Sequence, residues 1–529
     1  MTSVPSRMVQ RLGKWRLAFL IFLIVYGALL LFRLDYASPL WDEAPHLIGG
    51  LLLNRGQIQV YTQQYMFYPP LFDATIALSF ILLGESVFSA RLVAVFFGIL
   101  TLGALFEYVY RLHGPRNALF SSILLASMPG FFILSKTLLI ETMLLFFFST
   151  SLFLFFLGMY KKNKIMLLLS GVTIALGIIV KYQILIAGLV ILASPFLVLK
   201  DHLTKKFTRF FLIAIIALAV VLALFLFLVP NYFSVTLADW LYAIQVGTAE
   251  RSVYSTRFPL PIFYFIEMTY PYSHLHPISL PLYILGLFGL AFWLWRRRGE
   301  DKFYLIWFFV VYSVFTLIPN RSWRYVISLF PILAMSASDL ILSIWDKIKN
   351  RLPAYKNNLH KTAAIKIVAT VFIILICASL VYSWRDAYVM VEDEPFPIPT
   401  DEATQYIIEN SASNEATVVL FQSNQFSIEI VKFYFSIHNS GERNIWEYPE
   451  KAVDAYTPVL NETYLIKYCE STNVKYLLLF EHGNQTYFNS EWTAYYVLNR
   501  LIDSGQFISE AWVGTSPQRI FIIRFMLNS

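Results

Sequence analysis

The stretch LAFLIFLIVYGALLLFRLDYASPLWDEAPH, residues 17–46, sets the organisation of the rest of the chain. Its first part, Leu17–Phe32, is an apolar run that we interpret as a membrane span. Its second part contains two adjacent carboxylates, Asp42 and Glu43, close to where a bilayer surface would lie. Charge beside hydrocarbon costs free energy, so this acidic pair predicts a functional site at the membrane surface.

The composition indicates a membrane protein with a second, different part. The 529 residues are 57% hydrophobic and only 14% charged, with a mean hydropathy of +0.60. Soluble globular proteins carry about 25% charged residues. Apolar runs of span-like length recur as far as residue 384 and then stop. We therefore expect a polytopic α-helical membrane domain over residues 1–384, followed by a domain of another class.

The net charge of +7 does not indicate a nucleic-acid-binding protein. The basic residues form short clusters between apolar runs, which suits orientation in a bilayer better than a nucleic-acid-binding stripe. One of the two cysteines, Cys377, lies within an apolar run, so a disulfide with Cys469 is not expected. The sequence has no Cys/His spacing typical of a zinc site.

The basic clusters predict how the spans are oriented. Arg7, Arg11, Lys14 and Arg16 precede the first span, and no small-residue cleavage site follows it. This pattern predicts an uncleaved first span with a cytoplasmic N-terminus. Counting the apolar runs of sufficient length gives about eleven spans. If each run crosses the membrane in turn, every strongly basic cluster falls on the same side. The loop 33–90 and the C-terminal portion then face the extracytoplasmic side of a multi-pass cell-membrane protein. In chain order, the runs that we interpret as spans are 17–32, 91–110, a run that ends near 136, 138–160, 165–180, 182–199, 210–229, 278–295, 303–318, 325–345 and 362–382.

Within the first outer loop, Leu71–Leu83 is apolar but short, and Asp73 interrupts it. This length suits a juxtamembrane or re-entrant helix better than a full span.

The composition changes after Trp384. Residues 385–400 are acidic and proline-rich and predict a linker, and residues 401–529 predict a small soluble α/β domain. We expect helices at 401–409 and 491–502, and strands at 417–421, 475–480, 507–513 and 519–524.

An ordered set of short motifs resembles the GT-C superfamily of glycosyltransferases. The chain is most similar to lipid-A aminoarabinose transferases and protein O-mannosyltransferases. The similarity covers about the first 200 residues in order and continues more loosely to Pro331. The resemblance implies a GT-C-like transmembrane catalytic domain and a sugar donor carried on a polyprenyl phosphate. The motifs are Trp41–Ala44, Tyr68–Leu71, Gly84-Glu85, Ser89–Leu92, Glu141 after Met128-Pro129, and Arg324-Tyr325.

The resemblance also implies that Asp42 is the catalytic base, since an aspartate of the first loop has this role in the family. Transfer with inversion needs a carboxylate that deprotonates the acceptor hydroxyl while phosphate leaves from the opposite face of the sugar. The alternative interpretation is structural: Asp42 or Glu43 caps the helix that follows.

Other polar residues are candidates for assisting and binding roles. Glu43 and Glu141 are expected to assist Asp42, with a helix N-terminal carboxylate as the alternative for Glu141. Arg91, Lys181 and Arg324 are candidates for binding the donor phosphate, with interfacial snorkelling as the alternative for Arg91 and Lys181.

One position departs from the family pattern. Aminoarabinose transferases have a basic residue immediately before the Pro-Pro pair, thought to touch the donor phosphate, and here that residue is Tyr68. Tyr68 is therefore a candidate for the substrate-binding site, while the phosphate contact passes to Arg91, Lys181 or Arg324. No DxD signature of a metal-dependent nucleotide-sugar enzyme occurs, and His274 and His276 are better explained as loop histidines. No cofactor is expected apart from an optional divalent cation.

We therefore predict a membrane glycosyltransferase that acts on the extracytoplasmic face with inversion. Its donor is a polyprenyl-phosphate sugar, and its acceptor is a hydroxyl of a lipid, a glycan or a protein. A polytopic lipid or solute transporter is the first alternative, although such proteins usually place their site near the bilayer midplane. A non-catalytic receptor or assembly protein is the second.

Overall fold

A computed structural model describes residues 13–197, 261–270, 276–319, 321–354, 359–393, 397–423, 425–438, 443–448, 460–481 and 493–526, with a few isolated residues between 215 and 259. The chain folds into two compact units, and each combines segments that are distant in sequence. The first unit is Met1–Phe32, Met66–Phe72 and Arg91–Val391. The second is Arg33–Tyr65, Asp73–Ala90 and Glu392–Ser529.

The first unit is helical. Among the described residues, five helical segments are long and apolar enough to cross a membrane: Lys14–Leu31, Val87–His113, Glu141–Tyr160, Trp323–Asn350 and Ala363–Tyr388. Its helices are α2 (Lys14–Leu31), α6 (Val87–His113), α7 (Pro115–Ala126), α8 (Pro129–Leu134), α9 (Glu141–Tyr160), α10 (Lys164–Ile178), η2 (Tyr182–Ile184), α11 (Leu185–Leu197), α15 (Phe263–Glu267), α16 (Leu280–Arg296), α17 (Gly299–Leu317), η4 (Trp323–Leu329), α18 (Phe330–Ala354) and α19 (Leu359–Asp393). These apolar helices fit the expected polytopic membrane protein.

Most of the expected spans coincide with observed helices, with three differences. The run 210–229 lies almost wholly outside the described residues. The run ending near residue 136 is two helices, α7 and α8, because Pro129 begins a new helix. Residues 385–393, predicted as the start of the linker, continue helix α19.

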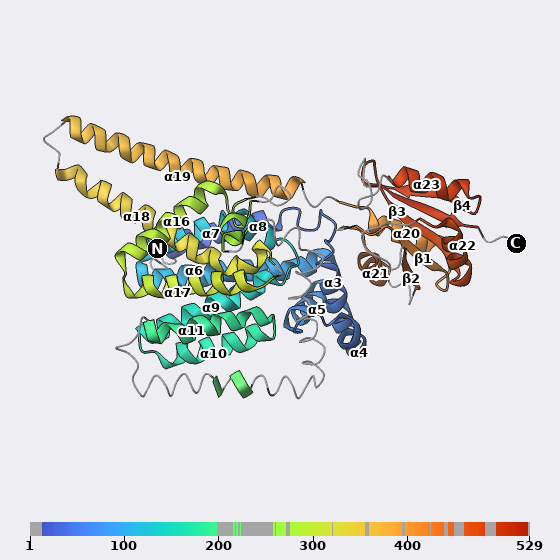
Figure 1. Ribbon diagram of the computed structural model, residues 1–529, viewed down its shortest axis with the longest axis horizontal. Helices are drawn as coiled ribbons and strands as arrows, with labels where there is room; N and C mark the ends of the chain where they lie inside the picture. Colours follow the sequence, from blue (N-terminus) through green and yellow to red (C-terminus); the bar gives the residue numbers. More distant parts are fainter. Residues whose placement is uncertain are drawn as a thin grey trace, which may run out of the picture. The chain divides into compact units, whose positions relative to one another are not determined.

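Close helix packing in this unit depends on small residues. Helices α9, α10 and α11 lie side by side in Figure 1. A Cβ atom on Gly289 of α16 would lie only 2.3 Å from the carbonyl carbon of Ser336 in α18. The backbones of α16 and α18 can therefore approach closely only because residue 289 is glycine.

The loop 33–90 contains α3 (Ala44–Asn54), α4 (Ile58–Val60), the π-helix η1 (Tyr61–Tyr65) and α5 (Leu71–Leu83). The observed bounds of α5 are those of the short apolar helix predicted from the sequence. A Cβ atom on Gly50 would lie 2.4 Å from Cγ2 of Ile76, so α3 and α5 are in close contact.

This loop packs against the C-terminal part of the chain within the second unit. Helix α3 contacts α21 (Ile428–Ile437). The Ser38 hydroxyl donates to the carbonyl of Ile398 at 3.1 Å and accepts from its N–H at 2.6 Å. Arg55 donates to the carbonyl of Ser436 at 2.8 Å. The first loop and the C-terminal segment therefore form one folded body.

The C-terminal segment forms a five-stranded sheet between two layers of helices. The strand order is β2-β1-β3-β5-β4, with β1 parallel to β2 and β3, and β5 antiparallel to β3 and β4. Residues of α20 and α21 pack on one face, and residues of α22 and α23 pack on the other. The elements are α20 (Thr400–Asn410), β1 (Ala416–Leu420), α21, β2 (Ile445–Tyr448), α22 (Glu462–Ser471), β3 (Val474–Phe480), α23 (Ala494–Asp503), β4 (Phe507–Val513) and β5 (Ile520–Phe525).

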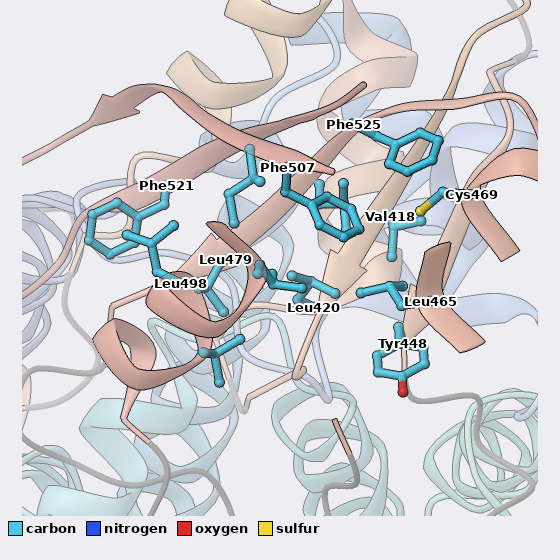
Figure 2. Packing of buried hydrophobic residues seen from close by; sticks show 14 of the residues in the cluster. Val418, Leu420, Tyr448, Leu465, Cys469, Leu479, Leu498, Phe507, Phe521 and Phe525 are labelled. Atoms are coloured by element: carbon cyan, nitrogen blue, oxygen red, sulfur yellow. The ribbon is translucent and has the colours of Figure 1, made fainter. Parts of the chain in front are cut away.

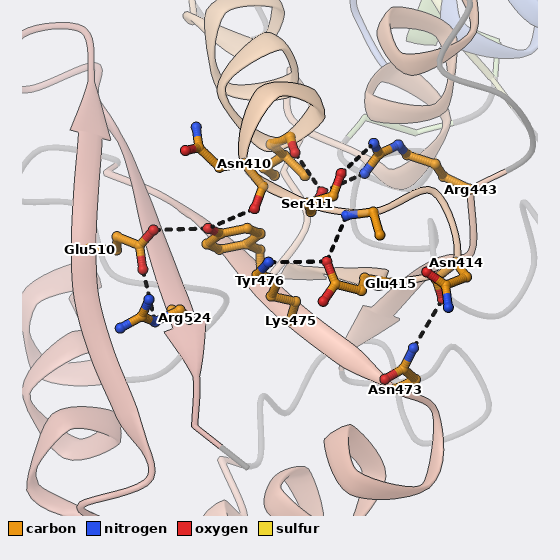
Figure 3. A network of polar contacts seen from close by, with 12 residues as sticks. Asn410, Ser411, Asn414, Glu415, Arg443, Asn473, Lys475, Tyr476, Glu510 and Arg524 are labelled. Atoms are coloured by element: carbon orange, nitrogen blue, oxygen red, sulfur yellow. Dashed lines mark hydrogen bonds and ion pairs between the residues drawn. The ribbon is translucent and has the colours of Figure 1, made fainter.

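The two faces of the sheet are buried because apolar residues occupy both sides of each inner strand. Figure 2 shows the cluster in which Cys469 of α22 and Leu498 of α23 pack over Val418 and Phe521. A polar network lies at another part of this fold (Figure 3), where Glu510 accepts from Tyr476 at 2.8 Å and pairs with Arg524 at 2.9 Å. Burial and the adjacent Glu510 raise the pKa of Tyr476 well above its usual value.

We expect the Cys469 thiol to be inert while the C-terminal segment is folded. Burial raises its pKa to about 12, so only about one thiol in ten thousand is ionised at pH 8. In a Cys377→Ser background, labelling with a thiol reagent should be slow and should become complete on denaturation. The added thiol of Ser471→Cys, exposed on the same helix, is the control and should react at once. Fast labelling of native Cys469 would contradict this packing.

We expect Glu85 to stabilise the fold only above acidic pH. Burial raises the pKa of its carboxyl, but hydrogen bonds from Arg55 and Asn54 outweigh burial and hold the pKa below 4.5. A depressed carboxyl pKa stabilises the fold above the unfolded pKa, and this contribution is lost as pH falls through the folded pKa. Glu85→Gln should therefore lower the melting temperature at neutral pH, by a difference that shrinks below about pH 4.5. Exposed Glu409→Gln is the control, and a difference for Glu85→Gln that does not change with pH would count against the prediction.

Candidate functional site

Asp42 lies on a short turn that leads into helix α3, in the second unit. The N–H groups of Glu43 and Ala44 both donate to the carbonyl of Leu40, at 2.9 and 3.2 Å. Asp42 itself is exposed, whereas the neighbouring Glu43 is fully buried. The turn therefore presents the first carboxylate of the pair outward and encloses the second.

Glu43 occupies the N-cap position of α3, but its side chain makes no capping bond to the helix. Its carboxylate instead accepts the backbone N–H of Leu40 at 2.8 Å, which closes the turn from the other side. The observed contact is thus a stabilising one for the turn that carries Asp42.

A buried polar network, which the sequence analysis did not predict, follows the acidic pair. Asp73 of α5 is 2% exposed and accepts the Tyr61 hydroxyl at 2.9 Å. Its other oxygen lies 2.7 Å from Nδ1 of His46, in the first turn of α3. The signal available in the sequence was an aspartate within an apolar helix, a position that requires polar partners.

Glu141 and Lys181 form a buried ion pair in the first unit. Lys181 Nζ lies 3.1 Å from Glu141 Oε1. Both side chains are buried, with 6% of the Lys181 side chain and 5% of the Glu141 side chain exposed. The second oxygen, Oε2, has no hydrogen-bond partner among the described residues. Glu141 begins α9, and Lys181 immediately precedes η2. A charged pair enclosed in an apolar fold marks a functional site by default.

Aromatic rings surround the lysine of this pair. Lys181 Nζ lies 5.0 Å from the centre of the Tyr68 ring and 5.7 Å from that of Tyr325. The Leu71 N–H donates to the carbonyl of Ile179 at 3.1 Å, which attaches the Tyr68-Pro-Pro-Leu71 segment to the turn before Lys181. Tyr68 is thus in contact with a cation supplied by the residue that precedes η2.

The candidate arginines differ in burial. Arg91 is 2% exposed in α6. Arg324 is partly buried in η4, which packs against α9 and whose Tyr325 ring lies beside Lys181. The first unit therefore brings Tyr68, Glu141, Lys181 and Arg324 together, while Asp42 and Glu43 belong to the second unit.

The described residues contain no group of three or more His, Cys, Asp or Glu side chains that could hold a metal ion. The Nδ1–H of His276 donates to the carbonyl of Thr269 at 2.7 Å, and His274 lies outside the described residues.

Residues 68–229 match the family model described as dolichyl-phosphate-mannose-protein mannosyltransferase. The match begins at Tyr68, so it includes Arg91, Glu141 and Lys181 but not Asp42 or Glu43. No curated protein gives a significant sequence match.

Comparison with solved structures shows a shared fold. ArnT from Cupriavidus metallidurans in the apo state matches with a TM-score of 0.56 and 14% identity, over 96% of this chain and 98% of that one. The same enzyme bound to undecaprenyl phosphate matches with a TM-score of 0.55 and 14% identity, over the same shares of the two chains. The Archaeoglobus fulgidus oligosaccharyltransferase tethered to an acceptor peptide with the NVT sequon matches with a TM-score of 0.59 and 14% identity, over 98% of this chain and 74% of that one.

The ordered motifs of the first 200 residues, the partial family match and the structural matches over nearly the whole chain agree with one another. They confirm the resemblance inferred from the sequence: this chain has the fold of the GT-C superfamily of glycosyltransferases and resembles ArnT and the protein O-mannosyltransferases.

Proposed function

We propose that this protein transfers a sugar from a polyprenyl-phosphate donor to an acceptor hydroxyl, with inversion, and that Asp42 is the base. The observation that carries the proposal is the exposed carboxylate of Asp42 on a turn that is closed by the buried Glu43 carboxylate and by two backbone hydrogen bonds to the Leu40 carbonyl. A base must be accessible to substrate and also fixed in direction, and such a turn provides both properties.

In the proposed reaction the acceptor oxygen attacks the anomeric carbon while the bond from that carbon to the phosphate oxygen breaks. The acceptor proton passes to Asp42, and the bonding electron pair leaves with the polyprenyl phosphate. A positioned base contributes about 10²- to 10⁴-fold to such a rate. Because Asp42 is exposed, it can return its proton to water after each turnover.

The leaving phosphate requires cationic partners. The buried pair of Glu141 and Lys181 carries no net charge, so we assign the compensating charge to Arg324 and Arg91. Lys181 supplies hydrogen-bond donors beside Tyr68, and Glu141 orients Lys181. Glu43 assists by fixing the turn on which Asp42 lies.

The neighbours suggest the classes of substrate. ArnT was crystallised with undecaprenyl phosphate, and the archaeal oligosaccharyltransferase with an acceptor peptide. We propose a polyprenyl-phosphate carrier here as well, with a lipid, glycan or protein hydroxyl as acceptor. The basic clusters further support a cytoplasmic N-terminus and an extracytoplasmic first loop and C-terminal domain in the cell membrane.

We expect Asp42→Asn to abolish sugar transfer while leaving donor binding intact, because the amide cannot accept the proton. The assay supplies undecaprenyl- and dolichyl-phosphate mannose and aminoarabinose and measures release of free polyprenyl phosphate by mass spectrometry. The matched control is Asp35→Asn, which removes another exposed acid of the same loop and should retain activity.

If Asp42→Asn releases polyprenyl phosphate at the wild-type rate, Asp42 is not the base. Movement of labelled lipid across vesicles by the wild type, without release of polyprenyl phosphate, would instead favour a transporter.

We expect loss of either partner of the buried ion pair to destabilise the fold. Glu141→Gln or Lys181→Met leaves one charge buried without its partner, which costs about 3–5 kcal/mol. The double variant should regain most of the melting temperature but not the transfer activity, because it lacks the hydrogen-bond donors that Lys181 supplies. A double variant with normal transfer would show that the pair has only a structural role.

A further inference from the structure

The network of His46, Asp73 and Tyr61 is not used by the chemistry proposed above, although it contains a buried carboxylate. Asp73 is 2% exposed, His46 6% and Tyr61 1%. Both oxygens of Asp73 are engaged, one by His46 at 2.7 Å and the other by Tyr61 at 2.9 Å. Its partners come from α3 and η1, so the carboxylate joins three elements of the first loop.

A purely stabilising role does not explain this arrangement. Replacing a buried ionic or polar pair by well-packed apolar residues is often neutral or even stabilising, so stability alone does not favour it. Directional hydrogen bonds, in contrast, fix the relative positions of the groups that they join more narrowly than apolar contacts do.

The local packing also adapts to the network. A Cβ atom on Gly49 of α3 would lie 3.0 Å from Oδ2 of Asp73 and 3.1 Å from Cε2 of Tyr61. Glycine at this position gives the Asp73 carboxylate and the Tyr61 ring room to lie directly against the backbone of α3.

The network is one of three fixed points along the segment that carries Asp42. Ser38, upstream, exchanges two hydrogen bonds with Ile398. In the turn between Leu40 and Glu43, the Leu40 N–H donates to the Glu43 carboxylate and the Glu43 N–H donates to the Leu40 carbonyl. His46, downstream, holds the first turn of α3, where the Leu47 N–H also donates to the carbonyl of Glu43 at 3.0 Å. Asp42 lies between these points, and its own side chain is exposed.

From this geometry we infer that His46, Asp73 and Tyr61 are positioning residues: they fix the first turn of α3 and thereby the direction of the Asp42 carboxylate. This inference rests on the proposed role of Asp42. It assigns a function to three residues that have no direct part in the proposed chemistry.

The first test compares kinetic constants of the full-length protein with the donor that the wild type turns over in the panel above. His46→Leu and Asp73→Asn should lower kcat by about tenfold to 10²-fold with little change in the KM for donor, because a displaced base slows only the chemical step. His46→Asn keeps an N–H donor near the position of Nδ1 and should restore part of kcat. Tyr61→Phe, which removes one hydroxyl, should have a smaller effect.

The second test separates positioning from stability. The triple variant His46→Leu, Asp73→Leu and Tyr61→Phe removes all three polar groups and should keep a melting temperature close to that of the wild type. Its kcat should nevertheless stay low, and hydrogen exchange of a peptide covering residues 38–50 should be faster than in the wild type. Normal kcat with normal exchange in this folded variant would overturn the inference.

Asp42→Asn and Asp35→Asn, measured in parallel, distinguish the two proposals. If Asp42→Asn is inactive while the network variants have normal kcat, the positioning role fails and the proposed function stands. If Asp42→Asn is active, or the wild type releases no polyprenyl phosphate, the proposed function fails. Hydrogen exchange alone then shows whether the network fixes the turn: unchanged exchange in the triple variant overturns the inference.

Discussion

The buried ion pair of Lys181 and Glu141 constrains how the polar groups inside the first unit can be arranged. A charge withdrawn from water into an apolar fold is tolerated only when an opposite charge and further polar contacts compensate it. Lys181 meets this requirement with Glu141 at 3.1 Å and with the faces of Tyr68 and Tyr325. The Tyr68-Pro-Pro-Leu71 segment, the start of α9 and the η4 helix are arranged around that compensation.

The same constraint distinguishes the acidic residues of the first loop. Glu43 and Asp73 are buried, and each accepts hydrogen bonds that hold a backbone turn or a helix pair. Asp42, one residue before Glu43, is exposed. Two adjacent carboxylates that look equivalent in the sequence therefore have opposite environments, and only the exposed one suits a base that must reach a substrate.

Elements that a local sequence pattern defines could be predicted. Features that depend on contacts between residues distant in the sequence could not. The bounds of α5 and the positions of β1, β3, β4 and β5 agree with prediction, because apolar runs of set length and turn residues define them. Helix α21 and strand β2 were not predicted, since IEIVKFYFSI is rich in residues that also favour strands and IWEY is short. The contact of Asp73 with His46 and Tyr61 could not be predicted, because it depends on how α3 and α5 pack. The roles of Asp42, Arg91 and Arg324 remain predictions.

The pairing of Ser38 with Ile398 links residues separated by 360 positions. At a synthesis rate of about 5–20 residues per second, the first loop exists for roughly 20–70 s before its partner is made. During that interval the acidic turn has no C-terminal surface to fold against. Assembly of this unit is therefore a late event in biogenesis, and a chain truncated before residue 398 would carry the Asp42 loop without the surface that anchors it.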